Sequence, residues 1–108
     1  MSSMRTLLHP ACAELGLPNI LYALGDPLRL QIVAQLAAAD AALSCGDIQI
    51  GEAVAKSTGS HHFKVLREAG LIRMVPQGRR VLVSLRRADL EQRFPGLLDT
   101  VLQTYQRI

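Results

Sequence analysis

The sequence predicts a mainly helical α+β domain, with about five helices and one two-stranded β-hairpin, on three observations. Apolar residues recur at helical spacing along most of the chain, two alternating runs stand close together near residue 80, and single Gly and Pro residues separate these segments. The chain has 108 residues, of which 49% are hydrophobic and 19% are charged. This balance suits one folded domain spanning residues 1–108.

The first two helices are expected before residue 40. One should lie between residues 10 and 24, where apolar residues recur every three or four positions. The next should span residues 26–38, because Asp26 is a good N-cap and Pro27 stands at the first helical position, where a missing N–H costs nothing.

The middle of the chain should hold a short helix followed by a clear one. Residues 40–55 have no firm periodicity, and a short helix is expected near Asp47. The next helix should run over residues 57–70, with Ser57 as its cap and Gly70 as its left-handed stop.

A hairpin and two further helices should complete the domain. The strands are expected at residues 71–75 and 80–85, with a turn at 76–79, and Asp89 should cap a short helix. From Pro95 a last helix should carry an apolar stripe formed by Leu97, Leu98, Val101, Leu102 and Tyr105. This order of helices and hairpin is the layout of a winged helix-turn-helix domain.

The charge of the chain is concentrated in one segment. Residues 54–88 contain eight basic residues and one acidic residue, a charge of +7, whereas the whole chain carries +3 and the remainder is therefore net acidic. Such a surplus on one helix and one hairpin indicates a phosphate-binding face. Aromatic residues make up only 4%, which argues against modules that stack single-stranded bases and favours double-stranded DNA as the partner.

The helix over residues 57–70 has a polar face that suits DNA contact. Ser60 and His61 are expected to contact base edges, and Lys64 to contact phosphates. The alternative is that this polar face is simply exposed to solvent and binds no partner. The full set of predicted DNA-binding residues is Ser57, Thr58, Ser60, His61, Lys64, Arg67, Arg79 and Arg80, with Thr58 and Arg67 on phosphates and the last two on the backbone or a narrow minor groove.

Three segments resemble the ArsR/SmtB family of bacterial winged-helix repressors. They are LGDPLRLQIVAQL (24–36), STGSHHFKVLREAGLI (57–72) and GRRVLVSL (78–85), and the similarity covers about residues 20–90. The resemblance implies a homodimer on an inverted-repeat operator, with a recognition helix at 57–69 and a wing tip at 76–80. It also implies dimerisation through the first and last helices, for which we expect Leu17, Leu21, Leu97, Leu98, Val101, Leu102 and Tyr105 to be used.

The metal sites of that family are not expected in this chain, nor is any cofactor. Metal-sensing members often carry a C-x-C pair where this chain has only Cys45, and no His follows His62 on the last helix. His61 and His62 are neighbours, so they point about 100° apart on a helix, unlike a chelating i, i+4 pair. His62 should instead pack in the protein or contact phosphate, and His9 should be exposed near the terminus.

Cys12 and Cys45 are left as a candidate thiol sensor. The dimer that the resemblance implies can place Cys12 of one subunit near Cys45 of the other, where two thiols could bind a soft ion or oxidise reversibly. The alternative is that each is a small buried hydrophobe.

The sequence thus predicts a transcriptional repressor that is released from its operator by an unidentified signal. An architectural DNA-binding protein without sequence preference is the alternative, because it would use the same basic face. An enzyme is not expected, since the chain offers no nucleophile with a positioned base. No export signal or membrane span is recognisable, so a cytoplasmic location is expected.

Overall fold

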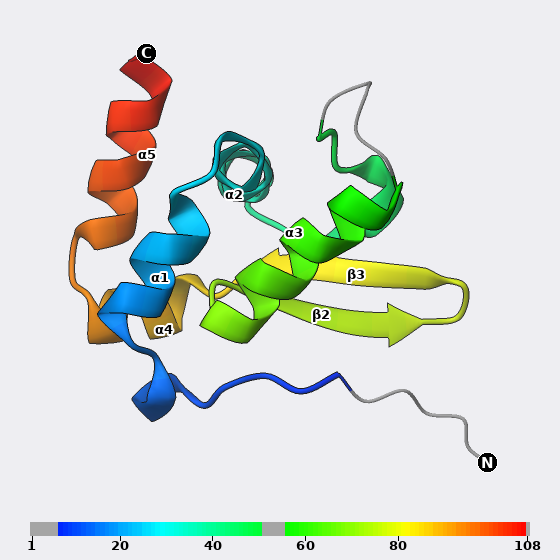
Figure 1. The fold of residues 1–108 in the computed structure, drawn as a ribbon, viewed down its shortest axis with the longest axis horizontal. Helices are drawn as coiled ribbons and strands as arrows, with labels where there is room; N and C mark the ends of the chain where they lie inside the picture. Colours follow the sequence, from blue (N-terminus) through cyan, green and yellow to red (C-terminus); the bar gives the residue numbers. More distant parts are fainter. Residues whose placement is uncertain (1–6, 51–55, 108) are drawn as a thin grey trace.

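The structure, a computed structural model, describes residues 7–50 and 56–107 and is a winged helix fold (Figure 1). Its α-helices are α1 (Leu17–Leu24), α2 (Pro27–Ala39), α3 (Lys56–Ala69), α4 (Arg87–Arg93) and α5 (Leu97–Arg107). Its strands are β1 (Leu43–Ser44), β2 (Ile72–Gln77) and β3 (Arg80–Leu85), and 3₁₀ turns lie at Cys12–Glu14 (η1) and Cys45–Asp47 (η2). The predicted mainly helical α+β class is confirmed.

Helix α2 begins where its cap residues predict. The Asp26 carboxylate accepts hydrogen bonds from the N–H groups of Leu28 (2.8 Å) and Arg29 (3.2 Å), which satisfies two donors that a helix start leaves free. The helix ends at Asp40, which adopts the left-handed region at φ 52°. Both ends are therefore fixed locally, one residue from the predicted limits.

The sheet differs from the prediction in two ways. It has three antiparallel strands in the order β1-β3-β2, because the two-residue strand β1 pairs Leu43 with Val83. Strand β2 also runs further than expected: Pro76 and Gln77 pair with β3, so the turn consists only of Gly78 and Arg79.

The pairing register explains why Pro76 fits in a strand. A two-residue hairpin makes Gln77 and Arg80 a hydrogen-bonded pair, so every second residue of β2, including Met74 and Pro76, directs its main-chain groups away from β3. Strand β2 lies at the edge of the sheet. A proline at an outward position removes no ladder hydrogen bond and leaves no free N–H for another strand to bind.

Helix α3 ends as predicted but does not begin as predicted. It already includes Lys56, so Ser57 lies within the helix and is not its cap. At the other end Gly70 adopts φ 94°, and the Leu71 N–H donates to the Leu66 carbonyl over 3.0 Å. A side chain at Gly70 would also collide with Leu15, since an added Cβ would lie 2.0 Å from its Cδ2.

Two smaller predictions, one for the start of α4 and one for the segment near Asp47, are wrong. Helix α4 begins at Arg87 with Arg86 at the N-cap position, so Asp89 lies in the first turn and does not cap the helix. The short helix near Asp47 is only the 3₁₀ turn η2, and residues 51–55 of the same stretch lie outside the described residues.

The core lies between the helices and the inner face of the sheet. Its largest fully buried side chains include Ile20 of α1, Ile32 of α2, Leu66 of α3 and Val83 of β3. Helix α5 joins α1 and α4 at one end of the molecule, while the β2–β3 hairpin extends at the other (Figure 1). Within residues 7–50 and 56–107, no helix combines the length and the apolar character needed to cross a membrane.

Candidate nucleic-acid interface

Helix α3 exposes the polar face that the sequence predicts for DNA. The side chains of Ser57, Ser60, His61 and Lys64 are exposed, and so is Thr58 beside them. The opposite face holds the helix to the core through side chains that are at most 6% exposed, namely His62, Phe63 and Leu66. A helix of this kind presents short polar groups to a groove while its back remains fixed.

His62 packs inside the protein, as one of the two predicted alternatives has it. Its Nδ1 atom lies 3.3 Å from Nη1 of Arg29, which is also buried. The neighbouring His61 is exposed, and the two ring planes are tilted by 51°. The two histidines therefore have different surroundings, as expected for adjacent positions of a helix.

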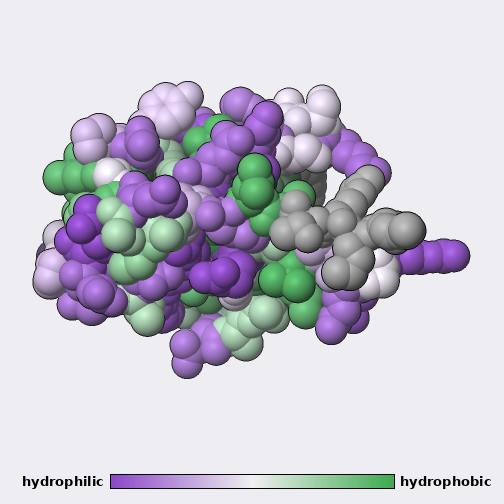
Figure 2. All heavy atoms as spheres, turned by 90° about the horizontal axis from the view of Figure 1, so that it is seen from below, coloured by the Kyte–Doolittle hydropathy of each residue, from purple (hydrophilic) through white to green (hydrophobic). Residues whose placement is uncertain are grey.

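The hairpin adds exposed cations at one end of the molecule. Arg79 lies in the turn and Arg80 begins β3, and both side chains are exposed. Figure 2 shows hydrophilic side chains, in purple, projecting beyond the rest of the surface at the end where the hairpin turn lies in Figure 1. Long basic side chains on a protruding hairpin suit contact with DNA backbone or minor groove.

Arg67 differs from the other predicted contact residues. Its Nη1 donates a hydrogen bond to the Leu8 carbonyl, and the residue is half-buried. The predicted phosphate contact of Arg67 therefore competes with a hydrogen bond inside the protein.

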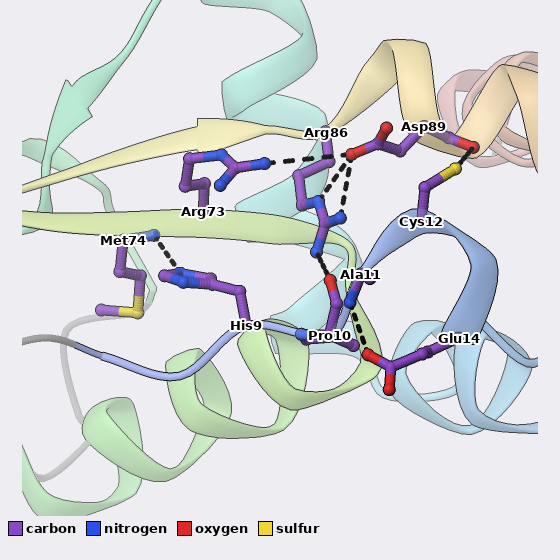
Figure 3. A network of polar contacts seen from close by, with 9 residues as sticks. All are labelled: His9, Pro10, Ala11, Cys12, Glu14, Arg73, Met74, Arg86 and Asp89. Atoms are coloured by element: carbon purple, nitrogen blue, oxygen red, sulfur yellow. Dashed lines mark hydrogen bonds and ion pairs between the residues drawn. The ribbon is translucent and has the colours of Figure 1, made fainter.

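The segment before α1, residues 7–15, runs along the edge of β2, and we call it the strap (Figure 3). His9 Nε2 accepts a hydrogen bond from the Met74 N–H over 3.0 Å, so the expectation that His9 is simply exposed is wrong. Arg86 donates to the Pro10 carbonyl over 2.8 Å, and Arg93 donates to the Leu15 carbonyl over 2.8 Å. The strap thus ties the base of the wing to α4.

Charges around the strap shift two pKa values downward. Burial, reinforced by the cations Arg73, Arg67 and Arg86, lowers the pKa of His9. The hydrogen bond from Arg86 lowers the pKa of Asp89, and their ion pair measures 2.9 Å. Sequence reasoning missed this network, although the i, i+3 spacing of Arg86 and Asp89 is a recognisable signal for a helix-start pair.

The two thiols are half-buried and belong to different parts of the chain. Cys12 Sγ lies 3.8 Å from the Asp89 carbonyl oxygen, whereas Cys45 lies in η2 beside β3. Burial raises the pKa of both thiols, and the Asp89 carboxylate adds to the rise at Cys12. Because the thiolate is the reactive form, both environments favour the unreactive thiol.

A pair of hydrogen bonds links α2 to the segment that precedes α3. The Gln35 side-chain amide accepts from the Gln49 N–H over 2.9 Å and donates to the Gln49 carbonyl. One side chain therefore satisfies both main-chain groups of Gln49, which lies between η2 and α3 in the chain. In the part of the chain that the structure describes, no three His, Cys, Asp or Glu residues are grouped so that they could hold a metal ion.

Helix α3 with its exposed polar face, packed on α2 and followed by a basic hairpin, is typical of a winged helix-turn-helix DNA-binding protein. Comparison with known proteins agrees: residues 24–75 match the model of a family described as "Helix-turn-helix domain". The chain is 40% identical over 83 residues to the uncharacterized HTH-type transcriptional regulator YceK of Bacillus subtilis (strain 168), which covers 77% of this chain and 83% of the relative.

Solved structures share the fold. The transcriptional repressor BigR from Xylella fastidiosa matches with a TM-score of 0.62 and 24% identity, over 82% of this chain and 84% of that one. An ArsR-like transcriptional regulator from Rhodococcus sp. RHA1 matches with a TM-score of 0.60 and 24% identity, over 88% and 86%. The chain belongs to the HTH-type transcriptional regulators. It shares the fold of ArsR-family regulators, which confirms the predicted resemblance at the level of the fold. These relatives are regulators of transcription and not enzymes.

Proposed function

We propose that this protein is a transcriptional repressor that binds an inverted-repeat operator as a homodimer. Helix α3 enters the major groove, where Ser60 and His61 contact base edges and Lys64 contacts phosphate. Arg79 and Arg80 reach the backbone or the adjacent minor groove from the wing. Occupation of an operator that overlaps a promoter excludes polymerase, so the mechanism needs no catalysis.

The observation that carries the proposal is that α3 exposes short polar side chains while the hairpin that follows it exposes long cations. Ser60 and His61 are exposed on α3 while the back of the helix is packed in the core. Short side chains on a fixed helix suit base edges, because base recognition depends on close and reproducible geometry. The long arginines of the wing suit phosphates, for which geometry matters less.

We base the proposed dimer on an apolar surface of α1 and α5, at the end of the molecule away from the hairpin turn. Leu17, Leu21 and Tyr22 of α1 are 43%, 49% and 66% exposed. Helix α5 lies beside α1 and adds Leu97, Val101 and Tyr105, which are half-exposed. Leu98 and Leu102 were also expected in the dimer surface, but they are buried in the protomer core, so we narrow the proposed surface to the other residues.

Gel shift with the protein's own upstream DNA tests the proposal. A scrambled duplex of equal length and composition is the control, at one fixed salt concentration. We expect at least a thousandfold preference for the upstream DNA, the lower end of the usual range for specific over non-specific binding. Equal affinity for both duplexes would contradict the proposal and indicate an architectural protein.

The candidate for the signal that releases the repressor is a reagent that acts on the thiols of Cys12 and Cys45. The raised pKa values of both thiols argue against this candidate, because they predict slow reaction with oxidants at neutral pH. A variant with both cysteines replaced by Ser should bind the operator normally and lose its response to oxidant or soft metal. An unchanged response in this variant would exclude the thiols as the sensor.

A further inference from the structure

Arg29 is a buried cation that has no carboxylate hydrogen-bonded to its guanidinium among residues 7–50 and 56–107. Its exposed fraction is 6%. Burying a charge is costly unless its hydrogens find partners, and here those partners are two backbone carbonyls and one imidazole. These partners of Arg29 belong to two other helices, α1 and α3.

Two of the hydrogen bonds hold the end of α1. Arg29 Nε donates to the Ala23 carbonyl over 2.7 Å, and Nη2 donates to the Tyr22 carbonyl over 3.1 Å. The guanidinium carbon also lies 5.2 Å from the centroid of the Tyr22 ring. The last carbonyls of a helix lack intrahelical partners and form its negative end, so a cation is stabilised at this position.

The third contact reaches the recognition helix and fixes the form of His62. A guanidinium can only donate, so Nδ1 of His62 accepts from Nη1 over 3.3 Å. The proton of the neutral ring therefore lies on Nε2. Arg29, on α2, thus joins three helices through one planar group.

The hydrogen bond between Arg29 and His62 has a preferred direction, whereas the apolar packing behind α3 has none. Phe63 and Leu66 hold the helix to the core by apolar contacts, whose attraction has no preferred direction. A hydrogen bond between two planar groups limits rotation, because it weakens steeply when its angle changes. His62 adjoins His61 and lies two residues from Ser60, so rotation of α3 moves both groups in the groove.

We propose that Arg29 is a positioning residue for sequence reading: through His62 it sets the rotation of α3 and hence where Ser60 and His61 meet the bases. The inference rests on the proposed function, in which these two residues read base edges. Phosphate contacts by long cations tolerate a small rotation, whereas base contacts do not. Arg29 therefore governs discrimination between DNA sequences more than affinity for DNA in general.

The test compares Arg29→Met with a matched control, Arg87→Met. Arg87 also donates to a carbonyl at a helix end, that of Ala37 over 2.7 Å, and both changes remove one positive charge. Affinities for the upstream duplex and the scrambled duplex are measured below the melting temperature of each variant. We expect Arg29→Met to lower the preference for the upstream duplex about tenfold or more, which is the value of one base contact. We expect Arg87→Met to leave that preference within about twofold of the wild type, because the loss of a positive charge weakens binding to both duplexes alike.

Two variants of His62 keep the test decisive if Arg29→Met does not fold. His62→Asn retains an acceptor near the Nδ1 position, whereas His62→Leu removes it. We expect the Asn variant to keep the preference and the Leu variant to lose it. Equal preference in the Asn and Leu variants, or in Arg29→Met and the wild type, would overturn the inference.

A measurement without DNA separates failure of this inference from failure of the proposed function. Nitrogen-15 NMR of the wild-type imidazoles should show the Nε2–H form of His62, and Arg29→Met should shift the amides of Ser60 and His61 while Arg87→Met does not. Unshifted amides in Arg29→Met would overturn the positioning role even if the operator is bound selectively. A wild type that does not discriminate the duplexes would instead overturn the proposed function, while the NMR result would still decide whether Arg29 orients α3.

Discussion

At the scale of single residues, His9 shows how one hydrogen bond selects a protonation state. Its Nε2 accepts from the Met74 N–H at the outer edge of β2, which requires a neutral ring with the proton on Nδ1. Burial and the cations Arg73, Arg67 and Arg86 lower the pKa of His9 for the same reason, because each disfavours the charged ring. The strap is thus held by a group whose pKa is lowered below its ordinary value of 6.5.

The stability contributed by His9 should therefore disappear in acid. A folded-state pKa below the ordinary value of 6.5 means that the contribution is fully present above that value and is lost as the pH falls through the lowered pKa. We expect His9→Leu to cost about 1 kcal/mol of unfolding free energy at pH 8, the value of a typical hydrogen bond, and the difference from the wild type to shrink at pH 5. Urea unfolding at both pH values measures this.

His9→Gln serves as the control for that measurement. Its amide oxygen keeps an acceptor near the Nε2 position and does not titrate, so its hydrogen bond should survive in acid. We expect His9→Gln to be more stable than His9→Leu at pH 5 as well as at pH 8. A difference between wild type and His9→Leu that stays constant with pH would refute the proposed role of the hydrogen bond.

His61 carries the second residue-scale prediction. If it contacts one base edge, His61→Ala should weaken operator binding by about 1 to 3 kcal/mol, and a mismatch at that base pair should no longer matter. Competition with singly substituted operator duplexes measures both effects. Lys64→Ala is the matched control, since loss of a phosphate contact should weaken binding to all of these duplexes alike.

Arg29 shows why the site could be predicted only in part. The buried positions of α2 are Arg29, Ile32, Val33 and Leu36, a regular i, i+3, i+4, i+7 pattern whose first member is charged. Reading by hydrophobicity alone replaces Arg29 with the half-buried Leu28. The exposed polar face of α3 was predictable because helix periodicity is local, but the partners of a buried arginine lie on other helices and leave no local pattern.

At the scale of elements, the start of α2 and the end of α3 were predicted well from local end signals, whereas the caps predicted at Ser57 and Asp89 were wrong. Asp26 and Pro27 begin α2, and Gly70 ends α3, through contacts with residues a few positions away. Strand β1 has only two residues, Leu43 and Ser44, too few for an alternating pattern. It forms because β3 offers a free edge, which is a property of the folded molecule.

The wing is the element that should contribute affinity without sequence preference. Its tip carries Arg79 and Arg80, both exposed, and each phosphate neutralised on B-DNA adds about 0.9 to the salt slope of binding. We expect Arg79→Ala and Arg80→Ala each to weaken binding to all duplexes similarly and to lower that slope by about one. Titrations between about 50 and 200 mM salt measure the slope, and an effect limited to one base position would argue against this role for the wing.

At the scale of the whole molecule, charge and apolar surface are separated. Six of the twelve Lys and Arg residues lie on α3 and the hairpin. Helices α1 and α5, which lie at the other end of the molecule from the hairpin turn (Figure 1), carry exposed or half-exposed apolar side chains. In the proposed dimer, two copies would join through α1 and α5 and leave both α3 helices free. Two such helices would contact successive major-groove sites about 34 Å apart, so the proposal predicts a palindromic operator.

The dimer can be tested by placing a charge on the exposed apolar surface. Leu21 of α1 is 49% exposed, so Leu21→Asp should leave the protomer folded but introduce a carboxylate into the proposed interface, where it would be buried without a partner. We expect sedimentation to show a monomer and operator affinity to fall at least a hundredfold, because each monomer then binds a single half-site. Leu102→Asp is the informative contrast: Leu102 is 7% exposed, so this change should unfold the protomer itself. A wild type that sediments as a monomer at micromolar concentration, or a Leu21→Asp variant that remains dimeric, would show that the exposed face of α1 serves another purpose.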